Sequence, residues 1–236
     1  MGRPLLCELH AHTTWSDGQL TLPELVDLYG SNGFDVLCVT DHAVRADHPA
    51  PSAVDPWTWP AYREDLRLEA ERARREYDLL LVPGLELTDD RPDPDLSAHA
   101  LAIGLDRYVS LEAGIDEALR AARAVGAALI AAHPHGPADD GRQRATRRFR
   151  REWSELRHLV DRWELFNRDE VYGWLARRGL PHVATGDFHE PGDLPSWKTL
   201  VPCAKDERAL VDRLRSSAPV YLVPFALDRR GEPQAA

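Results

Sequence analysis

The sequence has few cysteines, few lysines and no long apolar run. Its three cysteines, Cys7, Cys38 and Cys203, stand in apolar surroundings without the CxxC spacing of a zinc ribbon. We therefore expect buried free thiols and no disulfide framework. No stretch approaches the ~20 apolar residues of a membrane span, and the N-terminus lacks the apolar segment of a signal peptide. These absences predict a cytoplasmic protein with no membrane partner.

Positive charge is also scarce. Only Lys198 and Lys205 are lysines, and the formal net charge is −10, which argues against stable binding to DNA or RNA. One short segment differs because it is rich in arginine: Arg142, Arg144, Arg147, Arg148, Arg150 and Arg151. Two interpretations are open for it. The segment is either a solvent-exposed helix face paired with nearby carboxylates, or a basic rim that attracts an anionic substrate.

The composition and the apolar pattern predict the fold class. The 236 residues are 43% apolar and 29% charged, which is typical of a globular domain with a full core. Short runs rich in Val, Leu and Ile alternate with helical patterns, so we expect an α/β fold with a mostly parallel sheet. We expect strands near residues 4–9, 35–40, 79–83, 100–104, 127–132, 160–166 and 181–185, with weaker ones near 199–202 and 219–223. Helices fit residues 22–32, 60–77, 111–125, 147–158, 168–178 and 206–215.

Histidines and carboxylates follow the ends of these apolar runs. Imidazole and carboxylate groups are the side chains that hold zinc, manganese or iron in proteins. In a barrel, the C-terminal ends of the parallel strands meet at one mouth, so ligands far apart in sequence converge there. One candidate, His99, precedes its apolar run, and its position alone argues against it. The candidate ligands are His10, His12, Asp17, His42, Glu86, His99, His133, Asp187 and His189.

Two long polar segments lie beside the candidate ligands. Residues 44–60 and 88–97 are rich in proline and aspartate, and long loops of this kind usually form lids or substrate walls. Trp57 and Trp59 in the first loop are interpreted either as a stacking surface or as packing under the loop.

The order of the motifs resembles the PHP (polymerase and histidinol phosphatase) superfamily of metal-dependent phosphoesterases. The resemblance runs over residues 8–189, about three-quarters of the chain. A single HxH pair is a weak signal, whereas seven motifs in family order are a strong one. The motifs are Glu8-Leu9-His10-Ala11-His12-Thr13 with Ser16-Asp17-Gly18, Thr40-Asp41-His42, Pro83-Gly84-Leu85-Glu86, His99, Ala132-His133-Pro134, Glu164-Leu165-Phe166-Asn167 and Gly186-Asp187-Phe188-His189.

The resemblance implies a fold and a set of metals. It implies a distorted (β/α)7 TIM-like barrel of the PHP type, forming one domain over residues 1–236 with its motifs within residues 5–203. We expect the tail from about residue 226 to residue 236 to be flexible. Two or three divalent ions (Zn, Mn or Fe) are implied. The first would be held by His10, His12, Glu86 and Asp187, the second by Glu86, His99 and His133, and the third by Asp17, His42 and His189.

Other residues around the implied metals are expected to orient the ligands and to bind the substrate. Ligand histidines usually donate their second ring N–H to a nearby acceptor, and the candidate acceptors are Glu8, Asp41, Glu164 and Asn167. Family members usually carry Asp at the position of Glu8, and many carry an arginine where this chain has His135. Either His135 takes the place of that arginine, or an arginine of the 142–151 segment does. The candidates for the general acid are His135 and a metal-bound water, beside Asp187 as a catalytic metal ligand. The candidates for gripping a phosphate group are Arg45, Arg168 and Lys198.

These observations predict a metal-dependent phosphoric ester hydrolase acting on a small phosphorylated substrate. A metal-bridging hydroxide would attack phosphorus. Three divalent ions would leave a surplus of about two positive charges over their carboxylates and hydroxide, which favours a dianionic monoester. The alternatives are a phosphodiesterase or 5′ exonuclease acting on nucleotides or oligonucleotides, a metal-dependent amide or lactone hydrolase, and a non-catalytic metal-stabilised scaffold. The sequence does not indicate the oligomeric state.

Overall fold

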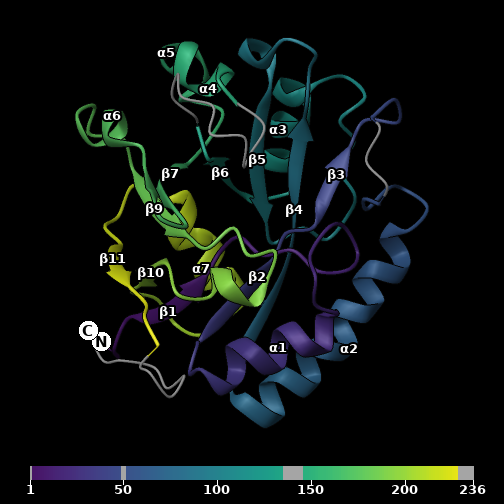
Figure 1. Cartoon of the computed structure of the whole chain (residues 1–236), viewed down its shortest axis with the longest axis vertical. Coiled ribbons are helices and arrows are strands. Elements are labelled where there is room, and N and C mark those ends of the chain that lie inside the picture. The colour runs from purple at the N-terminus through teal and green to yellow at the C-terminus, as the bar shows by residue number, and fades with distance from the viewer. Residues whose placement is uncertain (1, 49–51, 135–145, 228–236) are drawn as a thin grey trace.

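The computed structural model describes residues 2–48, 52–134 and 146–227, and it shows an α/β fold around one curled, mixed sheet (Figure 1). Part of the tail expected to be flexible, from residue 228 onward, lies outside the described residues. The strands are β1 Leu5–Glu8, β2 Val36–Val39, β3 His42–Val44, β4 Leu80–Asp89, β5 Ala98–Ile103, β6 Ala128–Ala132, β7 Arg162–Asn167, β8 Glu170–Val171, β9 His182–Thr185, β10 Trp197–Val201 and β11 Tyr221–Pro224.

The sheet order is β11-β10-β1-β2-β4-β5-β6-β7-β8, with β3 also paired to β4 and β9 to β7. β1, β2 and β4 are parallel neighbours, as are β6, β7 and β9. β5 runs antiparallel to both β4 and β6, and β10 runs antiparallel to β1. The expected barrel of parallel strand–helix units is therefore not confirmed, because reversed strands interrupt the parallel order.

Strands β9 and β10, which belong to opposite halves of the curled sheet, meet through a side chain. The Thr199 hydroxyl on β10 donates to the carbonyl of Ala184 on β9 at 2.7 Å and accepts from the Ala184 N–H at 2.9 Å. The hydroxyl thus satisfies both the backbone N–H and the carbonyl of Ala184, which would otherwise need partners in a backbone ladder. Among the described residues, β9 and β10 share no backbone ladder, so the sheet is curled toward a barrel without being closed by one.

Most expected helices form, but three are shorter than their patterns predict. The helices are α1 Leu22–Ser31, α2 Trp59–Tyr77, α3 Ile115–Ala124, α4 Arg148–Arg151, α5 Trp153–Leu156, α6 Gly173–Ala176 and α7 Glu207–Arg215, with short 3₁₀ turns at Pro94–Leu96 and Pro191–Asp193. The pattern over 147–158 splits into α4 and α5 at Glu152, and the pattern over 168–178 yields only α6, because β8 takes residues 170–171. α1 begins at a capping box between Thr21 and Glu24 and covers the sheet with α2 (Figure 1).

Two apolar layers stabilise this arrangement. The larger cluster includes the buried faces of α1, α2 and α3 against the sheet. A second cluster packs alternate strand residues, among them Leu5, Cys7, Val36 and Cys38, in one layer with residues of α7. No helix of the described residues is long and apolar enough to cross a membrane. Trp59 is buried against Tyr62, which confirms the packing interpretation for it, whereas the Trp57 side chain is 89% exposed.

The cysteines give a first testable prediction. Burial raises the pKa values of the Cys7 and Cys38 thiols well above the ordinary value, so the reactive thiolate forms are scarce at neutral pH. Cys203 is only half-buried. At pH 8 we expect a thiol reagent to modify Cys203 first, and Cys7 and Cys38 only after unfolding in denaturant. Rapid modification of all three in the native protein, followed by mass spectrometry, would contradict this packing.

Candidate metal centre

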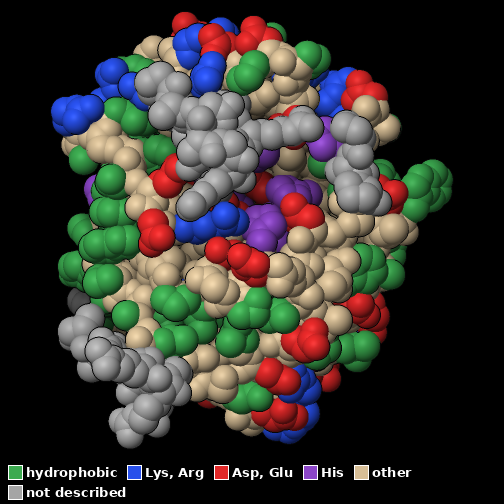
Figure 2. All heavy atoms as spheres, viewed as in Figure 1, with side chains coloured by type: hydrophobic (Ala, Val, Ile, Leu, Met, Phe, Trp, Pro, Cys, Tyr) green, Lys and Arg blue, Asp and Glu red, His purple; other side chains and the backbone are tan. Residues whose placement is uncertain are grey.

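The predicted ligands come together at one edge of the sheet. His10 and His12 follow β1, His42 begins β3, Glu86 lies within β4, and Asp187 and His189 follow β9. The space-filling view shows histidine side chains in a recess on this face, between acidic and basic groups (Figure 2). Residues more than 170 positions apart in the chain thus meet, as the strand-end argument predicts: the His12 N–H donates to the Phe188 carbonyl at 2.9 Å.

The reversed direction of β5 explains His99. This histidine lies at the start of β5, opposite Thr88 on β4 and Ala132 on β6. Because β5 is antiparallel to both neighbours, its N-terminal end lies at the edge where β4 and β6 have their C-terminal ends. His99 therefore reaches the same recess as His133, which follows β6. His99 precedes its apolar run because, in an antiparallel strand, the residue at this edge of the sheet lies at the N-terminal end of the strand.

Three overlapping groups of side chains could each hold a metal ion. Within each group, one ligand atom per residue lies within 4.8 Å of every other. Glu86 belongs to two groups and His12 to two, so the groups form one continuous centre. The groups are His10, His12 and Glu86; Glu86, His99 and His133; and His12, Asp17, His42 and His189.

The spacing of the atoms in the first group fits metal coordination. Two ligands that each lie about 2.1 Å from zinc at a tetrahedral angle are about 3.4 Å apart. His12 Nε2 lies 3.5 Å from Glu86 Oε2 and 3.6 Å from Asp187 Oδ1, and His10 Nε2 lies 3.3 Å from Asp187 Oδ1. These separations exceed ordinary hydrogen bonds and match the distance between ligands that share an ion.

The third-metal group repeats this spacing. Asp17 Oδ1 lies 3.4 Å from His42 Nε2 and 3.3 Å from His189 Nε2. The pairs around Glu86, His99 and His133 are closer: Glu86 Oε1 lies 3.1 Å from His99 Nδ1 and 3.0 Å from His133 Nε2. Both oxygens of Glu86 are thus surrounded by imidazole nitrogens, and Glu86 is the residue that joins the groups.

Two buried nitrogens support a metal at the first group. His10 Nε2 and His12 Nε2 are buried and have no hydrogen-bond partner among the described residues. A buried polar atom without a partner costs about 1–3 kcal/mol. Each nitrogen points toward the oxygens of Glu86 and Asp187, so a cation between them would satisfy all four groups. The donor set of imidazole and carboxylate suits zinc, manganese or iron.

The electrostatics of the centre favour a cation. The histidines lower the pKa values of the Glu86 and Asp187 carboxyls well below the ordinary range, although burial opposes this. Burial, with His42 and His189 nearby, lowers the pKa of His12 to about 3, so this ring is neutral at pH 7 and has a lone pair for a metal. Burial opposes protonation of His42 as well, but Glu86 and Asp17 raise its pKa to about 10.

Backbone strain is concentrated at the same edge. His133, Arg168 and Asp187 have φ values of 25°, 50° and 43°, in the left-handed region that non-glycine residues rarely adopt. Such conformations cost about 1–3 kcal/mol each and persist where the surroundings hold them. Here the N–H of His133 donates to Glu164 Oε2 at 2.6 Å, and the carbonyl of Asp187 accepts two bonds from the Arg168 guanidinium at 3.0 and 2.7 Å.

Glu164 fixes two ligand positions. Its Oε1 accepts from His10 Nδ1 at 2.9 Å, which leaves Nε2 of that ring directed at Glu86 and Asp187. Its Oε2 accepts from the His133 N–H and from the Asn167 amide at 2.8 Å. The predicted role of Glu164 as an acceptor for a ligand histidine agrees with this geometry, whereas Asn167 orients Glu164.

Asp41 and Glu8 act on the backbone and not on ligand rings. Asp41 accepts from the Thr13 N–H at 2.8 Å and from the Ser16 hydroxyl at 2.6 Å, so it fixes the loop that leads to Asp17. Glu8 Oε1 accepts from three N–H groups, including those of His10 at 3.1 Å and Gly186 at 2.8 Å. The expectation that they accept ring N–H groups is therefore not met among the described residues. The Asp41 oxygens bind the loop at Thr13 and Ser16, and the Glu8 oxygens bind backbone N–H groups and the Lys198 ammonium.

The predicted phosphate-binding residues differ in placement. Arg168 lies at the recess, with Nη2 2.9 Å from His189 Nδ1. Arg45 binds Asp47 at 3.0 Å and the Glu112 carbonyl at 3.4 Å. Lys198 is fully buried and pairs with Glu8, so its ammonium does not face the recess, and this expectation is corrected. His135, the candidate general acid, lies outside the described residues, as do Arg142 and Arg144.

Asp90 and His48 join the centre without having been predicted. Asp90 Oδ1 lies 3.0 Å from His99 Nε2, and its Oδ2 lies 3.0 Å from His48 Nε2. Because His99 Nδ1 faces Glu86, the Asp90 carboxylate receives the opposite N–H of that ring and fixes its tautomer. The available signal was the position of Asp90, directly after β4 and within the polar loop over the mouth.

We expect Asp90→Asn to weaken metal binding about 10–100-fold, because an amide no longer selects the ring orientation of His99. The measurement is a metal titration of the metal-free protein by competition with a chelator. Asp93→Asn, in the same loop but capping Asp95, serves as the matched control. Equal affinities of Asp90→Asn and the unmodified protein would show that Asp90 does not position His99.

The comparisons with known proteins agree with this fold. The sequence matches no protein-family model and no curated protein sequence. A two-domain protein from Bacteroides vulgatus, containing a predicted PHP-like metal-dependent phosphoesterase, superposes with a TM-score of 0.65 at 20% identity over 93% of this chain. This protein's fold is similar to that of PHP-like metal-dependent phosphoesterases. The matched part is 64% of the Bacteroides chain, so this chain spans somewhat under two-thirds of it.

A second solved structure has a different activity in its description. It is an amidohydrolase from Chromobacterium violaceum, with bound sulfate and no metal, which superposes with a TM-score of 0.58 at 14% identity. The match covers 92% of this chain and 97% of that one. At these identities the similarity establishes the fold, and the chemistry must be argued from the residues of the site.

Proposed function

We propose that this protein is a metal-dependent hydrolase of the PHP type, with a distorted (β/α)7-like arrangement, and that it hydrolyses small phosphate monoesters. The observation that carries the proposal is the spacing of the ligand atoms. Five pairs of imidazole nitrogens and carboxylate oxygens lie 3.3–3.6 Å apart around two positions. A histidine that hydrogen-bonds to a carboxylate lies closer to it than this, whereas two ligands of one shared cation are separated by this distance.

Divalent ions bound here would supply Lewis-acid stabilisation of a phosphoryl oxygen and a water activated at neutral pH. The residues of the chain position that chemistry. Glu164 holds His10 with Nε2 directed into the centre, and Asp90 holds His99 with Nδ1 directed at Glu86. The loop fixed by Asp41 presents Asp17 at the solvent side, where its side chain is 49% exposed. Substrate reaches the centre from this side.

Arg168 supports phosphate over a neutral substrate. Its guanidinium is half-buried at the recess and lies 3.7 Å from Asp187 Oδ2, with two N–H bonds fixed on the Asp187 carbonyl. A guanidinium presents donors that match the oxygens of a phosphate group. Neutral histidines outnumber carboxylates among the ligands, so bound divalent ions would keep a net positive charge suited to a dianion.

The similarity to the Chromobacterium violaceum amidohydrolase makes a metal-dependent amide hydrolase the second candidate. A phosphodiesterase is the third, since multinuclear centres clamp both oxygens of an in-line displacement. One set of assays distinguishes them. Protein of measured metal content is given p-nitrophenyl phosphate, bis-p-nitrophenyl phosphate and p-nitroacetanilide, and release of the chromophore is followed.

We expect the monoester to be hydrolysed fastest and the anilide not at all. His42→Ala removes a ligand of the third group and should lower monoester hydrolysis more than about 100-fold. His158→Ala, an exposed histidine outside the recess, is the control and should leave the rate unchanged. Hydrolysis of neither phosphate ester by fully metal-loaded protein would contradict the proposal. An unchanged rate in His42→Ala would remove the third group from the reaction.

A further inference from the structure

A second concentration of positive charge lies away from the metal ligands. A cavity of about 340 Å³ lies between α4 and α6 and is lined by Arg150, Trp174, Arg177 and Arg178. Arg150 is half-buried, and the other two arginines are exposed at the end of α6. We call these residues the arginine pocket. None of these described lining residues carries a carboxylate.

The arginines of this pocket lack the partners that other arginines of the chain have. On the same short helix, Arg148 binds Asp116 and Glu152 at 2.9 Å, and Arg151 binds Glu152 at 2.6 Å. Within residues 2–48, 52–134 and 146–227, the guanidinium groups of the arginine pocket form no ion pair and no hydrogen bond. Arg148 and Arg151 thus agree with the interpretation of paired side chains, whereas Arg150 lines the pocket.

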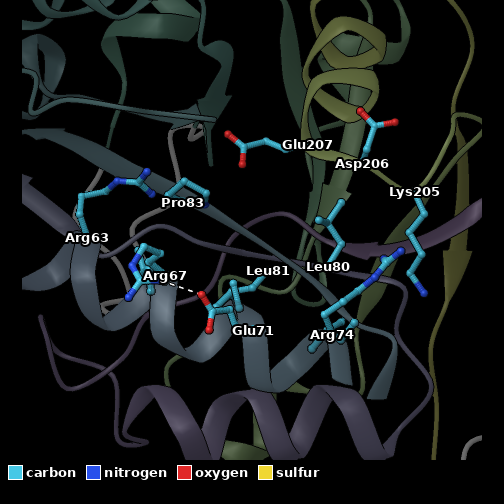
Figure 3. A pocket seen from close by; sticks show the side chains of 13 residues that line it. Arg63, Arg67, Glu71, Arg74, Leu80, Leu81, Pro83, Lys205, Asp206 and Glu207 are labelled. Atoms are coloured by element: carbon cyan, nitrogen blue, oxygen red, sulfur yellow. Dashed lines mark hydrogen bonds and ion pairs between the residues drawn. The ribbon is translucent and has the colours of Figure 1, made fainter. Parts of the chain in front are cut away.

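The chain has enough acidic residues to pair with these arginines. The chain has 39 Asp and Glu against 29 Lys and Arg. Another cavity of the molecule shows the usual arrangement: it has about 570 Å³ and lies between α2, β4 and the start of α7 (Figure 3). There Arg67 binds Glu71 at 2.6 Å, and Arg74 and Lys205 lie 3.4 and 3.0 Å from Asp78. The arginine pocket differs because, among the described residues, no carboxylate pairs with its guanidinium groups.

Aromatic rings contact one of these arginines, Arg178. The guanidinium carbon of Arg178 lies 4.0 Å from the centroid of the Trp153 ring and 5.9 Å from that of Trp174. Stacking on an indole occupies the face of a guanidinium and leaves the N–H groups at its edge free to donate. Trp174 is itself buried, packed edge-on against Trp163, with Nε1 donating to the Pro134 carbonyl at 3.3 Å. One wall of the pocket is therefore formed by a buried, hydrogen-bonded tryptophan.

We propose that the arginine pocket binds the phosphate groups of a small anion, at a site separate from the metal centre. Guanidinium groups bind phosphate oxygens with two parallel N–H donors, which makes this the ligand class they fit best. The volume of about 340 Å³ is near the lower end for small-molecule sites and suits a diphosphate-sized group. The site depends on the positions of three arginines and two tryptophans, and not on the proposed hydrolase activity.

The pocket is connected to the metal centre through one residue. Pro134, which accepts the Trp174 N–H, directly follows the candidate ligand His133. Trp174 thus both lines the arginine pocket and binds the backbone next to a candidate metal ligand. Its test must separate the two sites, because phosphate compounds also bind metal ions.

The test is isothermal titration of metal-free protein with inorganic pyrophosphate. The variants are Arg150→Gln/Arg177→Gln in the pocket, His42→Ala in the metal centre, and Arg107→Gln, an exposed arginine elsewhere, as the matched control. We expect the pocket variant to bind at least about tenfold more weakly, because charge-assisted bonds are lost. His42→Ala and Arg107→Gln should bind as the unmodified protein does, and added salt should weaken binding.

Three results of this titration would overturn the proposal or its assignment to a small anion. Equal binding by the pocket variant and the unmodified protein, or loss of binding in His42→Ala, would overturn the proposal. Circular dichroism confirms that the variants are folded, and the single variant Arg177→Gln, at an exposed position, repeats the test if the double variant is not. A DNA dodecamer that binds more tightly than pyrophosphate, with the same dependence on the pocket, would overturn the assignment to a small anion.

Discussion

Glu86→Gln is expected to weaken metal binding at the two groups that share Glu86 and to lower monoester hydrolysis by more than about 100-fold, the largest effect of any single substitution at the centre. Glu86 has two oxygens that both face ligand histidines: Oε1 faces His99 and His133, and Oε2 faces His12. An amide of the same size keeps the shape but removes the negative charge that two groups share. The measurement is metal content per chain after dialysis, together with the rate on p-nitrophenyl phosphate.

Glu155→Gln provides the control, because this glutamate is exposed on α5. It should retain full metal content and activity. Circular dichroism should show Glu86→Gln folded, since a neutral side chain in a buried position carries no desolvation cost for a charge. A Glu86→Gln protein that binds as many ions as the unmodified protein would refute the bridging role of Glu86.

Lys198→Met should produce the largest loss of stability. Lys198 and Glu8 are both fully buried and form an ion pair beneath the centre, where Lys198 also donates to the Ser196 hydroxyl at 2.8 Å. Removing one partner leaves a buried charge without compensation, which costs about 3–5 kcal/mol. For a domain of this length we expect the melting temperature to fall by about 10 °C. Thermal unfolding followed by circular dichroism measures the change.

A double variant distinguishes the loss of the ion pair from the cost of leaving one buried charge unpaired. Glu8→Gln/Lys198→Met removes both charges, while the side-chain carbonyl of the introduced amide can still accept from the N–H groups of His10 and Gly186. Replacing a whole buried pair by neutral groups is often close to neutral, so the double variant should recover most of the lost stability. Lys205→Met, at a partly exposed pair with Asp35, should cost less than about 1 kcal/mol. A single-variant loss as small as that of Lys205→Met would contradict the account.

The strand-end pattern in the sequence was sufficient to predict the α/β class and the convergence of the ligands. Both follow from local features: apolar runs specify buried strands, and polar residues after them must lie at the sheet edge. Even the weak strands appear, as β10 and β11. The pattern does not specify strand direction, because an alternating or apolar run reads the same in both directions. The reversal of β5, which places His99 in the centre, therefore needed the structure.

Contacts between distant positions account for what the sequence did not predict. Lys198 seemed available to a substrate because it lies at a strand end, but its partner Glu8 is 190 residues away in the chain. The close approach also fixes Gly186, since a Cβ there would collide with both side chains. Asp90 was one of several aspartates in a polar loop, and nothing local marks it as the partner of His99. Its role follows from the register of β4 against β5.

The most direct test of the account is a crystal structure of the zinc- or manganese-loaded protein with anomalous scattering recorded at the metal edge. We expect two anomalous peaks at the recess, one between His10, His12, Glu86 and Asp187 and one between Asp17, His42 and His189. If the centre is fully loaded, we expect a third peak beside Glu86, His99 and His133. Crystals that contain stoichiometric metal but show no peak among these side chains would contradict it.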